Sequence, residues 1–237
     1  MADCALAASG LHGLGNLAGT CGSGRRSDGL TYPTMKTKLL ISAVALALCA
    51  PAPAAFAQGS TTLTTGRGLN GTDYISPTFL YSNGDTFDYT GVGFRLNKTF
   101  HPDFDLIATT GFTRSQRVAS ARAEASDFDA GVRWHTTTGW GRPFAEATVG
   151  YNWWKYGAAR DHSFTYALAT GLELQLTDKF SIAPLIGYAD ATSYNGGGDF
   201  YGVLRTNLWL DDRWSIRMNF SFSEDGNGIG AGFAWAF

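Results

Sequence analysis

Large apolar residues alternate with small ones over the last ten positions of the chain, from Gly228 to Phe237. A β-strand sends alternate side chains to opposite faces, so one face of this segment is large and apolar and the other carries only Gly and Ala. A strand of a soluble sandwich would place polar residues on its second face. A bare second face instead suits the inside of a narrow barrel whose large residues face lipid.

The same two-residue period recurs along the chain and predicts ten strands, separated by turn signals such as Ser82-Asn83-Gly84-Asp85. The predicted strands cover about residues 73–82, 86–98, 104–114, 127–136, 143–155, 164–176, 180–191, 200–210, 213–223 and 228–237. Connections after odd strands are mostly longer and polar, as at 157–162, whereas those after even strands are tight, as at 177–179. Outer-membrane barrels combine long external loops with short periplasmic turns. The predicted fold is therefore all-β: an antiparallel up-and-down transmembrane β-barrel of ten strands, with eight strands as the alternative.

Aromatic residues gather near the predicted strand ends, which is typical of the interfacial girdles of a membrane barrel. The girdle expected on the periplasmic side contains Phe100, Phe104, Trp134, Trp140, Phe144, Phe180, Trp209, Trp214, Trp235 and Phe237. The girdle expected near the loops contains Tyr81, Phe87, Tyr151, Trp153, Phe164, Tyr166, Tyr188, Phe200 and Phe222.

A secretory signal peptide is predicted over residues 35–57. Met35-Lys36-Thr37-Lys38 is a basic start, the next dozen residues are apolar, and Ala55 and Ala57 form a small-x-small cleavage signal. The apolar run is shorter than the roughly 20 residues that a spanning helix needs. We therefore expect export through the periplasm with cleavage after Ala57. Lipidation at Cys49 is disfavoured because Leu48, which precedes it, is not small.

The remaining segments follow from this assignment. Residues 1–34 carry no helix or strand pattern, and we expect them to be a mis-called N-terminal extension, since a secretory signal begins near the true start. A twin-arginine signal at Arg25-Arg26 is the weaker alternative, because no apolar run follows it. Residues 58–71 are expected to be a short periplasmic N-terminal segment, and residues 72–237 the outer-membrane β-barrel.

Composition excludes several function classes. All three cysteines precede residue 58, so the expected mature chain has no disulfide framework, thiol nucleophile or cysteine metal site. Residues 58–237 hold 14 Lys and Arg against 18 Asp and Glu, which gives a net charge of −4. Without a basic surplus, nucleic acid is not an expected partner. We expect no cofactor and no bound metal.

The chain resembles the small bacterial outer-membrane barrels of the OmpA and OmpX/Ail type. The resemblance rests on the signal peptide, the alternating hairpins and the terminal aromatic ladder of Phe233, Trp235 and Phe237, and it covers roughly residues 72–237. It implies that this ladder is the assembly signal read by the barrel-assembly machinery, with periplasmic chaperones as further partners. Residues 199–202 and the two closing strands also show a weak similarity to the Ax-type small barrels of xanthomonads. Ten strands exceed the eight usual in these families, and no periplasmic domain is expected after the barrel.

The strand period also predicts a charged lumen. Extending it places nine ionisable residues on the inward faces: Arg95, Asp105, Asp129, Arg133, His135, Glu146, Glu173, Arg205 and Arg217. Four are basic and four acidic without the histidine, and buried charges persist only when they are paired. A balanced network that fills a narrow lumen is the first interpretation. A selective pore lined by the same groups is the second.

Catalysis is the third interpretation of the chain. Asp161, His162 and Ser163 are adjacent in a predicted external loop and include the residue types of a hydrolytic triad, but neighbours on a strand point to opposite faces. No further catalytic motif is recognisable. The function expected first is therefore that of a small, monomeric outer-membrane protein of a Gram-negative bacterium, with a structural or adhesion-like role through its external loops. Its partners would be outer-membrane lipid, lipopolysaccharide and host or environmental surfaces. A porin-like narrow ion or solute channel is the alternative, and an outer-membrane lipid-modifying hydrolase the second alternative.

Overall fold

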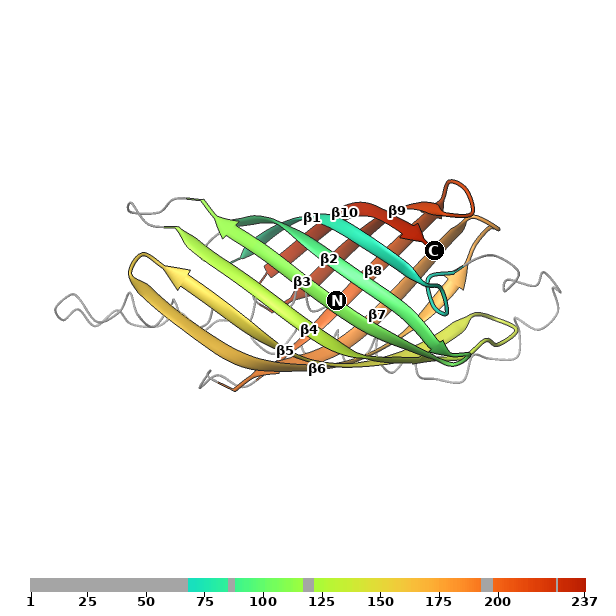
Figure 1. Cartoon of the computed structure of the whole chain (residues 1–237), viewed down its shortest axis with the longest axis horizontal. Coiled ribbons are helices and arrows are strands. Elements are labelled where there is room, and N and C mark those ends of the chain that lie inside the picture. The colour runs from blue at the N-terminus through green and yellow to red at the C-terminus, as the bar shows by residue number, and fades with distance from the viewer. Residues whose placement is uncertain (1–67, 85–87, 117–121, 193–197, 225) are drawn as a thin grey trace, which may run out of the picture. The chain divides into compact units, whose positions relative to one another are not determined.

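Ten antiparallel strands close into one barrel, in which each strand pairs with its neighbours in sequence and β1 pairs with β10 (Figure 1). The structure is a computed structural model that describes residues 68–84, 88–116, 122–192, 198–224 and 226–237. The strands are β1 (Tyr74–Gly84), β2 (Asp88–His101), β3 (Phe104–Ser115), β4 (Ala123–His135), β5 (Arg142–Tyr156), β6 (Ala159–Gln175), β7 (Phe180–Ala191), β8 (Asp199–Trp209), β9 (Trp214–Ser223) and β10 (Gly226–Ala236). The prediction of a ten-stranded up-and-down barrel is confirmed, and the eight-stranded alternative is wrong.

The barrel is closed by the pairing of its first and last strands. This register runs from Tyr74 opposite Ala236 to Gly84 opposite Gly226. Gly232 allows close approach at this seam, since a Cβ there would collide with the carbonyl oxygen of Pro77. Closure removes both sheet edges, so every strand has a partner on each side.

Side chains alternate between a large apolar outer face and a small or polar inner face. On the outside, Phe79 is 74% exposed and Leu168 is 61% exposed, whereas Ser76 and Ala234 on the inside are fully buried. This arrangement is the inverse of a soluble protein and matches a barrel whose outer face contacts hydrocarbon. Among the described residues, no helix is long and apolar enough to cross a membrane.

Several strands extend further toward the expected external side than the sequence predicts. β4 begins at Ala123 rather than 127, and β6 begins at Ala159 rather than 164. β5 and β6 are joined by Gly157 and Ala158 alone, with Tyr156 opposite Ala159 and a left-handed φ of 58° at Gly157. The prediction of a longer loop over residues 157–162 is therefore wrong. The physical reason is that strand pairing continues above the membrane, where the outward side chains are polar and the apolar period no longer marks the strand.

The turns at the opposite end are held by short-range hydrogen bonds. In the connection from β8 to β9, the backbone N–H groups of Arg213 and Trp214 donate to the Asp211 carboxylate at 2.7 and 2.8 Å. These two donors lower the pKa of Asp211 below its usual value. The chain therefore reverses there with a turn that Asp211 specifies locally.

Two aromatic residues assigned to the periplasmic girdle lie inside the barrel instead. Phe144 is 1% exposed and Trp209 is 3% exposed. Both occupy inward positions of their strands, so their place near a strand end did not determine their facing. Among the other girdle residues, Trp134, Trp214 and Phe200 are exposed on the outer face. Phe87 lies outside the described residues.

Candidate functional site

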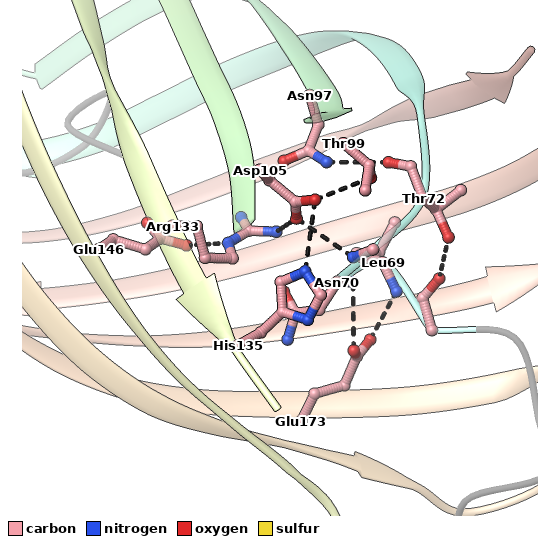
Figure 2. A network of polar contacts seen from close by, with 12 residues as sticks. Leu69, Asn70, Thr72, Asn97, Thr99, Asp105, Arg133, His135, Glu146 and Glu173 are labelled. Carbon is pink, nitrogen blue, oxygen red and sulfur yellow. Dashed lines mark hydrogen bonds and ion pairs between the residues drawn. The ribbon is translucent and has the colours of Figure 1, made fainter. Parts of the chain in front are cut away.

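The lumen contains all eight charged residues that the strand period placed there, and each is 5% exposed or less: Arg95, Asp105, Asp129, Arg133, Glu146, Glu173, Arg205 and Arg217. His135 is also 5% exposed. The strands bring most of these residues together in the half of the barrel that carries the C-terminus. Part of this network is drawn in Figure 2.

Glu146 on β5 is the centre of the cluster. Its Oε1 atom lies 2.6 Å from Arg133 Nε, 3.3 Å from Arg205 Nη1 and 3.7 Å from Arg95 Nη2. Arg133 comes from the neighbouring strand β4, where it lies directly opposite Glu146. Arg205 and Arg95 come from β8 and β2, so the carboxylate also joins strands that are far apart around the barrel. One carboxylate therefore offsets three buried cations.

Arg133 extends the network along the barrel axis, toward the end at which the C-terminus lies. Its Nη1 atom lies 3.6 Å from Asp105 Oδ2, and Asp105 Oδ1 lies 3.4 Å from His135 Nε2. Thr99 Oγ1 also donates to Asp105 at 2.8 Å. Figure 2 shows Asp105, Arg133 and His135 converging from β3 and β4. The Thr99 contact is a hydrogen bond, whereas Arg133 Nη1 and His135 Nε2 approach Asp105 at ion-pair distance without hydrogen-bond geometry.

Aromatic rings supply further partners for the cations. Phe144 lies under both Arg133 and Arg205, with ring centroids 5.7 and 5.8 Å from the guanidinium carbons. Arg217 lies over the ring of Tyr74 at 5.0 Å. A ring face attracts a cation most strongly where water is excluded. The inward placement of Phe144 is thus part of how the barrel holds its arginines.

Asp129 lies apart from this cluster. Its carboxylate accepts hydrogen bonds from Thr109 Oγ1 at 3.4 Å and Thr165 Oγ1 at 3.2 Å. A Cβ at Gly150 would collide with the Asp129 carboxylate. The inward glycine therefore leaves the space that a neighbouring charged side chain occupies.

The segment that precedes β1 enters the mouth of the barrel, and sequence reasoning missed this. The Leu69 and Asn70 N–H groups donate to the two Glu173 oxygens at 2.7 and 3.3 Å. The Gly71 N–H donates to Asp105 Oδ2 at 3.1 Å. Leu69 also packs with Tyr74, Trp209, Ala234 and Ala236 in a buried cluster.

One side-chain and one backbone donor of β2 also hold this segment. Asn97 Nδ2 donates to the Thr72 carbonyl at 2.8 Å, and the Thr99 N–H donates to Asp73 Oδ1 at 2.7 Å. We call residues 68–73 the N-terminal plug, because they cross the mouth between β2, β3 and β6 (Figure 2). Residues 68–71 are the end of the segment 58–71 that the sequence predicts to be periplasmic. The one feature of the local sequence that indicates a turn here is Gly71, whose φ of 72° allows the chain to turn into β1.

The candidate hydrolytic trio is not assembled. Ser163 is 3% exposed and faces the lumen, whereas His162 is exposed on the outside and stacks on Tyr151 with ring centroids 5.6 Å apart. Both residues lie within β6 rather than in a loop. The described residues contain no group of three His, Cys, Asp or Glu side chains that could hold a metal ion.

The terminal aromatic ladder lies on the outer face. Phe233 is 53% exposed, Trp235 38% and Phe237 56%, and the rings of Trp235 and Phe237 are 5.9 Å apart. These residues are accessible from outside the barrel, and their role in assembly stays a prediction. The cleavage residues Ala55 and Ala57 lie outside the described residues, as do all of residues 1–34 and 35–57.

Comparison with known proteins gives structural likenesses only. No family model matches the chain, and no curated protein sequence is similar to it. Neisserial surface protein A is 12% identical, with a TM-score of 0.39, and the match covers 70% of this chain and 96% of that one. An outer membrane channel from Pseudomonas putida F1 is 12% identical, with a TM-score of 0.43, over 73% of this chain and 98% of that one. The N-terminal barrel domain of Pseudomonas aeruginosa OprF is 14% identical, with a TM-score of 0.36, over 69% and 98%.

The class of the protein follows from its own geometry. A closed antiparallel barrel with ten strands, an apolar outer face and buried charges inside is the architecture of the small bacterial outer-membrane barrels. The architecture agrees with the resemblance of the sequence to the small barrels of the OmpA and OmpX/Ail type.

Proposed function

We propose that this protein is a small, monomeric outer-membrane barrel whose lumen is closed, and that it has a structural or surface-interaction role. The observation that carries the proposal is the N-terminal plug. Glu173 and Asp105 bind its backbone from two strands, and Leu69, which is 5% exposed, fills the space beside Trp209. Behind the plug, the cluster around Glu146 crosses the lumen.

A filled lumen is expected for a barrel of this size. Barrels of about eight strands are filled by side chains, whereas those of 16 to 18 strands leave an aqueous channel. Arg133 is 1% exposed and Asn207 is 1% exposed, which supports a lumen that is packed at this level. Interaction with other molecules would then take place at the external end and on the outer wall.

The long hairpin of β5 and β6 supports a surface role. These are the longest strands, at 15 and 17 residues, and their tip carries exposed Lys155 and Arg160. Trp153 and Tyr151 pack edge to face at 4.8 Å, and His162 stacks on Tyr151. These rings lie below the tip, whereas Lys155 and Arg160 beside the Gly157–Ala158 turn are the part of the hairpin that a surface partner can reach.

Planar-bilayer conductance of the refolded protein tests the closed lumen. We expect no steady openings from protein that shows a heat-shifted gel band, which demonstrates folding. The double variant Glu173→Gln, Asp105→Asn should loosen the plug yet stay silent, because the Glu146 cluster still crosses the lumen. Adding Glu146→Gln to it should give openings, while the exposed control Asp178→Asn should stay silent. Steady, ion-selective openings of the unmodified protein would contradict a closed lumen.

A narrow channel is the second candidate, favoured by one specific observation. Buried polar atoms in the lumen have no protein partner, among them the Tyr74 hydroxyl, Glu146 Oε2 and both amide atoms of Asn207. Such atoms are normally hydrogen-bonded by water. The lumen holds four arginines and four carboxylates, so such a channel would discriminate weakly between anions and cations, and reversal potentials in a salt gradient would show this.

A further inference from the structure

A row of charged side chains crosses the outer face of four strands near the expected external end. Arg114 on β3 is directly opposite Glu124 on β4, Glu124 is opposite Lys155 on β5, and Lys155 is opposite Arg160 on β6. Directly opposite residues of neighbouring strands point to the same face. We call these four residues the charged row.

The charged row contains more cations than its single carboxylate can neutralise. Glu124 Oε1 lies 3.1 Å from Arg114 Nη2, and Glu124 Oε2 lies 3.6 Å from Lys155 Nζ. The Arg114 and Lys155 side chains are nevertheless 46% and 47% exposed, and Arg160 is exposed as well. The row therefore presents a net charge of +2 to its surroundings.

Arg122, which precedes β4, adds a further exposed cation beside the row. The remainder of the same rim carries acidic residues. Asp88, Asp190 and Glu224 lie at the same end on the other strands or their connections, and Asp190 accepts from Tyr166 at 2.7 Å. Asp161 on β6 is an exposed acid beside Arg160, but the four cations of β3 to β6 outnumber it and Glu124. The described part of the external rim therefore has a net positive charge over β3 to β6 and acidic residues elsewhere, so that sector favours an anion.

The position of the charged row along the barrel axis, relative to the membrane, indicates what kind of anion it can bind. The next outward positions down the strands hold Phe112, Trp153 and His162, of which Phe112 is 40% and Trp153 49% exposed. One step further down lie Phe128 and Phe164, which are 50% and 44% exposed. Aromatic residues of this kind mark the level where hydrocarbon gives way to headgroups. The charged row stands two residues above the first of them, or about 7 Å along the strand, and so lies at headgroup level.

We propose that the charged row binds the phosphate groups of an anionic, phosphorylated lipid in the outer leaflet. This rests on the proposed function, because it requires a membrane barrel with this end outside. Guanidinium and ammonium groups are the preferred protein donors to phosphate. Adjacent strands are about 4.8 Å apart, so the cations from β3 to β6 span roughly 14 Å, enough for more than one phosphate.

The test uses the refolded protein in phosphatidylcholine vesicles that contain either diphosphorylated lipid A or its dephosphorylated form. Trp153 adjoins the row, and quenching of its fluorescence by headgroup-labelled lipid reports occupancy. We expect tighter association with the phosphorylated form. Each neutralised cation should weaken it by about fivefold, so the triple variant Arg114→Gln, Lys155→Gln, Arg160→Gln should lose about 100-fold. Glu124→Gln removes the competing carboxylate and should strengthen association.

Matched controls separate this site from general charge effects. The variant Lys98→Gln, Lys179→Gln, Arg213→Gln removes three cations from the opposite end and should leave association unchanged. Equal association with both lipid forms, or no effect of the triple variant and of Glu124→Gln, would overturn the inference. Competition by millimolar inorganic phosphate as effective as that by the lipid would also overturn it, since the site would then be one for free phosphate. Failure of the protein to insert, seen as no heat-shifted band, would instead overturn the proposed function.

Discussion

Removal of the Glu146 charge should be among the most damaging changes in the lumen. The substitution Glu146→Gln keeps the shape of the side chain but leaves Arg133, Arg205 and Arg95 without the carboxylate that all three approach within 3.7 Å. All four side chains are 6% exposed or less, so water would screen the cations poorly.

The structure sets the size of the effect. Removing one partner of a buried ion pair typically costs about 3–5 kcal/mol, because the remaining charge stays buried without compensation. Relative to a total stability of about 5–15 kcal/mol, this is a large fraction. The unfolding equilibrium constant should therefore rise by roughly 10²- to 10⁴-fold. The cation–π contacts of Phe144 with Arg133 and Arg205 would offset only part of this.

Urea-induced unfolding in lipid vesicles, followed by tryptophan fluorescence and the heat-shifted gel band, measures this change. Glu124→Gln is a matched control at an exposed ion pair, where the loss should be below about 1 kcal/mol. If Glu146→Gln is as stable as this control, the reasoning is refuted. The lumen would then have to be wet enough to solvate three guanidinium groups, which would favour the channel.

Two further predictions concern the outer wall and the C-terminus. Leu168→Arg places a charge on a lipid-facing position near the middle of the membrane-facing part of β6 and should cost roughly 2–4 kcal/mol, whereas Ala169→Ser on the inner face should cost less than about 1 kcal/mol. Equal yields of the heat-shifted band for both variants would contradict the facing of β6. Deletion of Phe237 should reduce the folded barrel recovered from the outer membrane of cells but leave refolding in detergent almost unchanged, because the ring is 56% exposed. Equal cellular levels would remove the assembly-signal interpretation, and impaired refolding in detergent would assign Phe237 a structural role instead.

The strand period was enough to place the charged residues on the inner face. Facing is a local property, because successive side chains of a strand alternate whatever the neighbouring strands do. This is why Arg133, Glu146 and Arg205 were placed correctly from sequence. The same parity puts Phe144 and Trp209 on the inner face, so nearness to a strand end does not by itself place an aromatic ring in a girdle.

The strand ends were harder to predict. Hydrophobic alternation fades where the barrel leaves the membrane, so the external parts of β4 and β6 have the composition of loops. Backbone pairing continues there, since Arg114, Glu124, Lys155 and Arg160 remain in register. The charged row follows from that register and could not be found from the segments taken singly.

By itself, the sequence determined the fold class and the side of the wall that each charge occupies, and it favoured ten strands over eight, because these depend on local alternation and on turn chemistry. Only the tertiary structure decided which charges meet. Closure brings Arg95 of β2 and Arg205 of β8 to Glu146 on β5, although Arg205 lies 59 positions from Glu146 in the chain. It also creates the mouth that the N-terminal plug fills, where Leu69 lies 104 residues from its partner Glu173. Such contacts depend on the curvature of the closed sheet, which positions side chains across the lumen and which no local pattern contains.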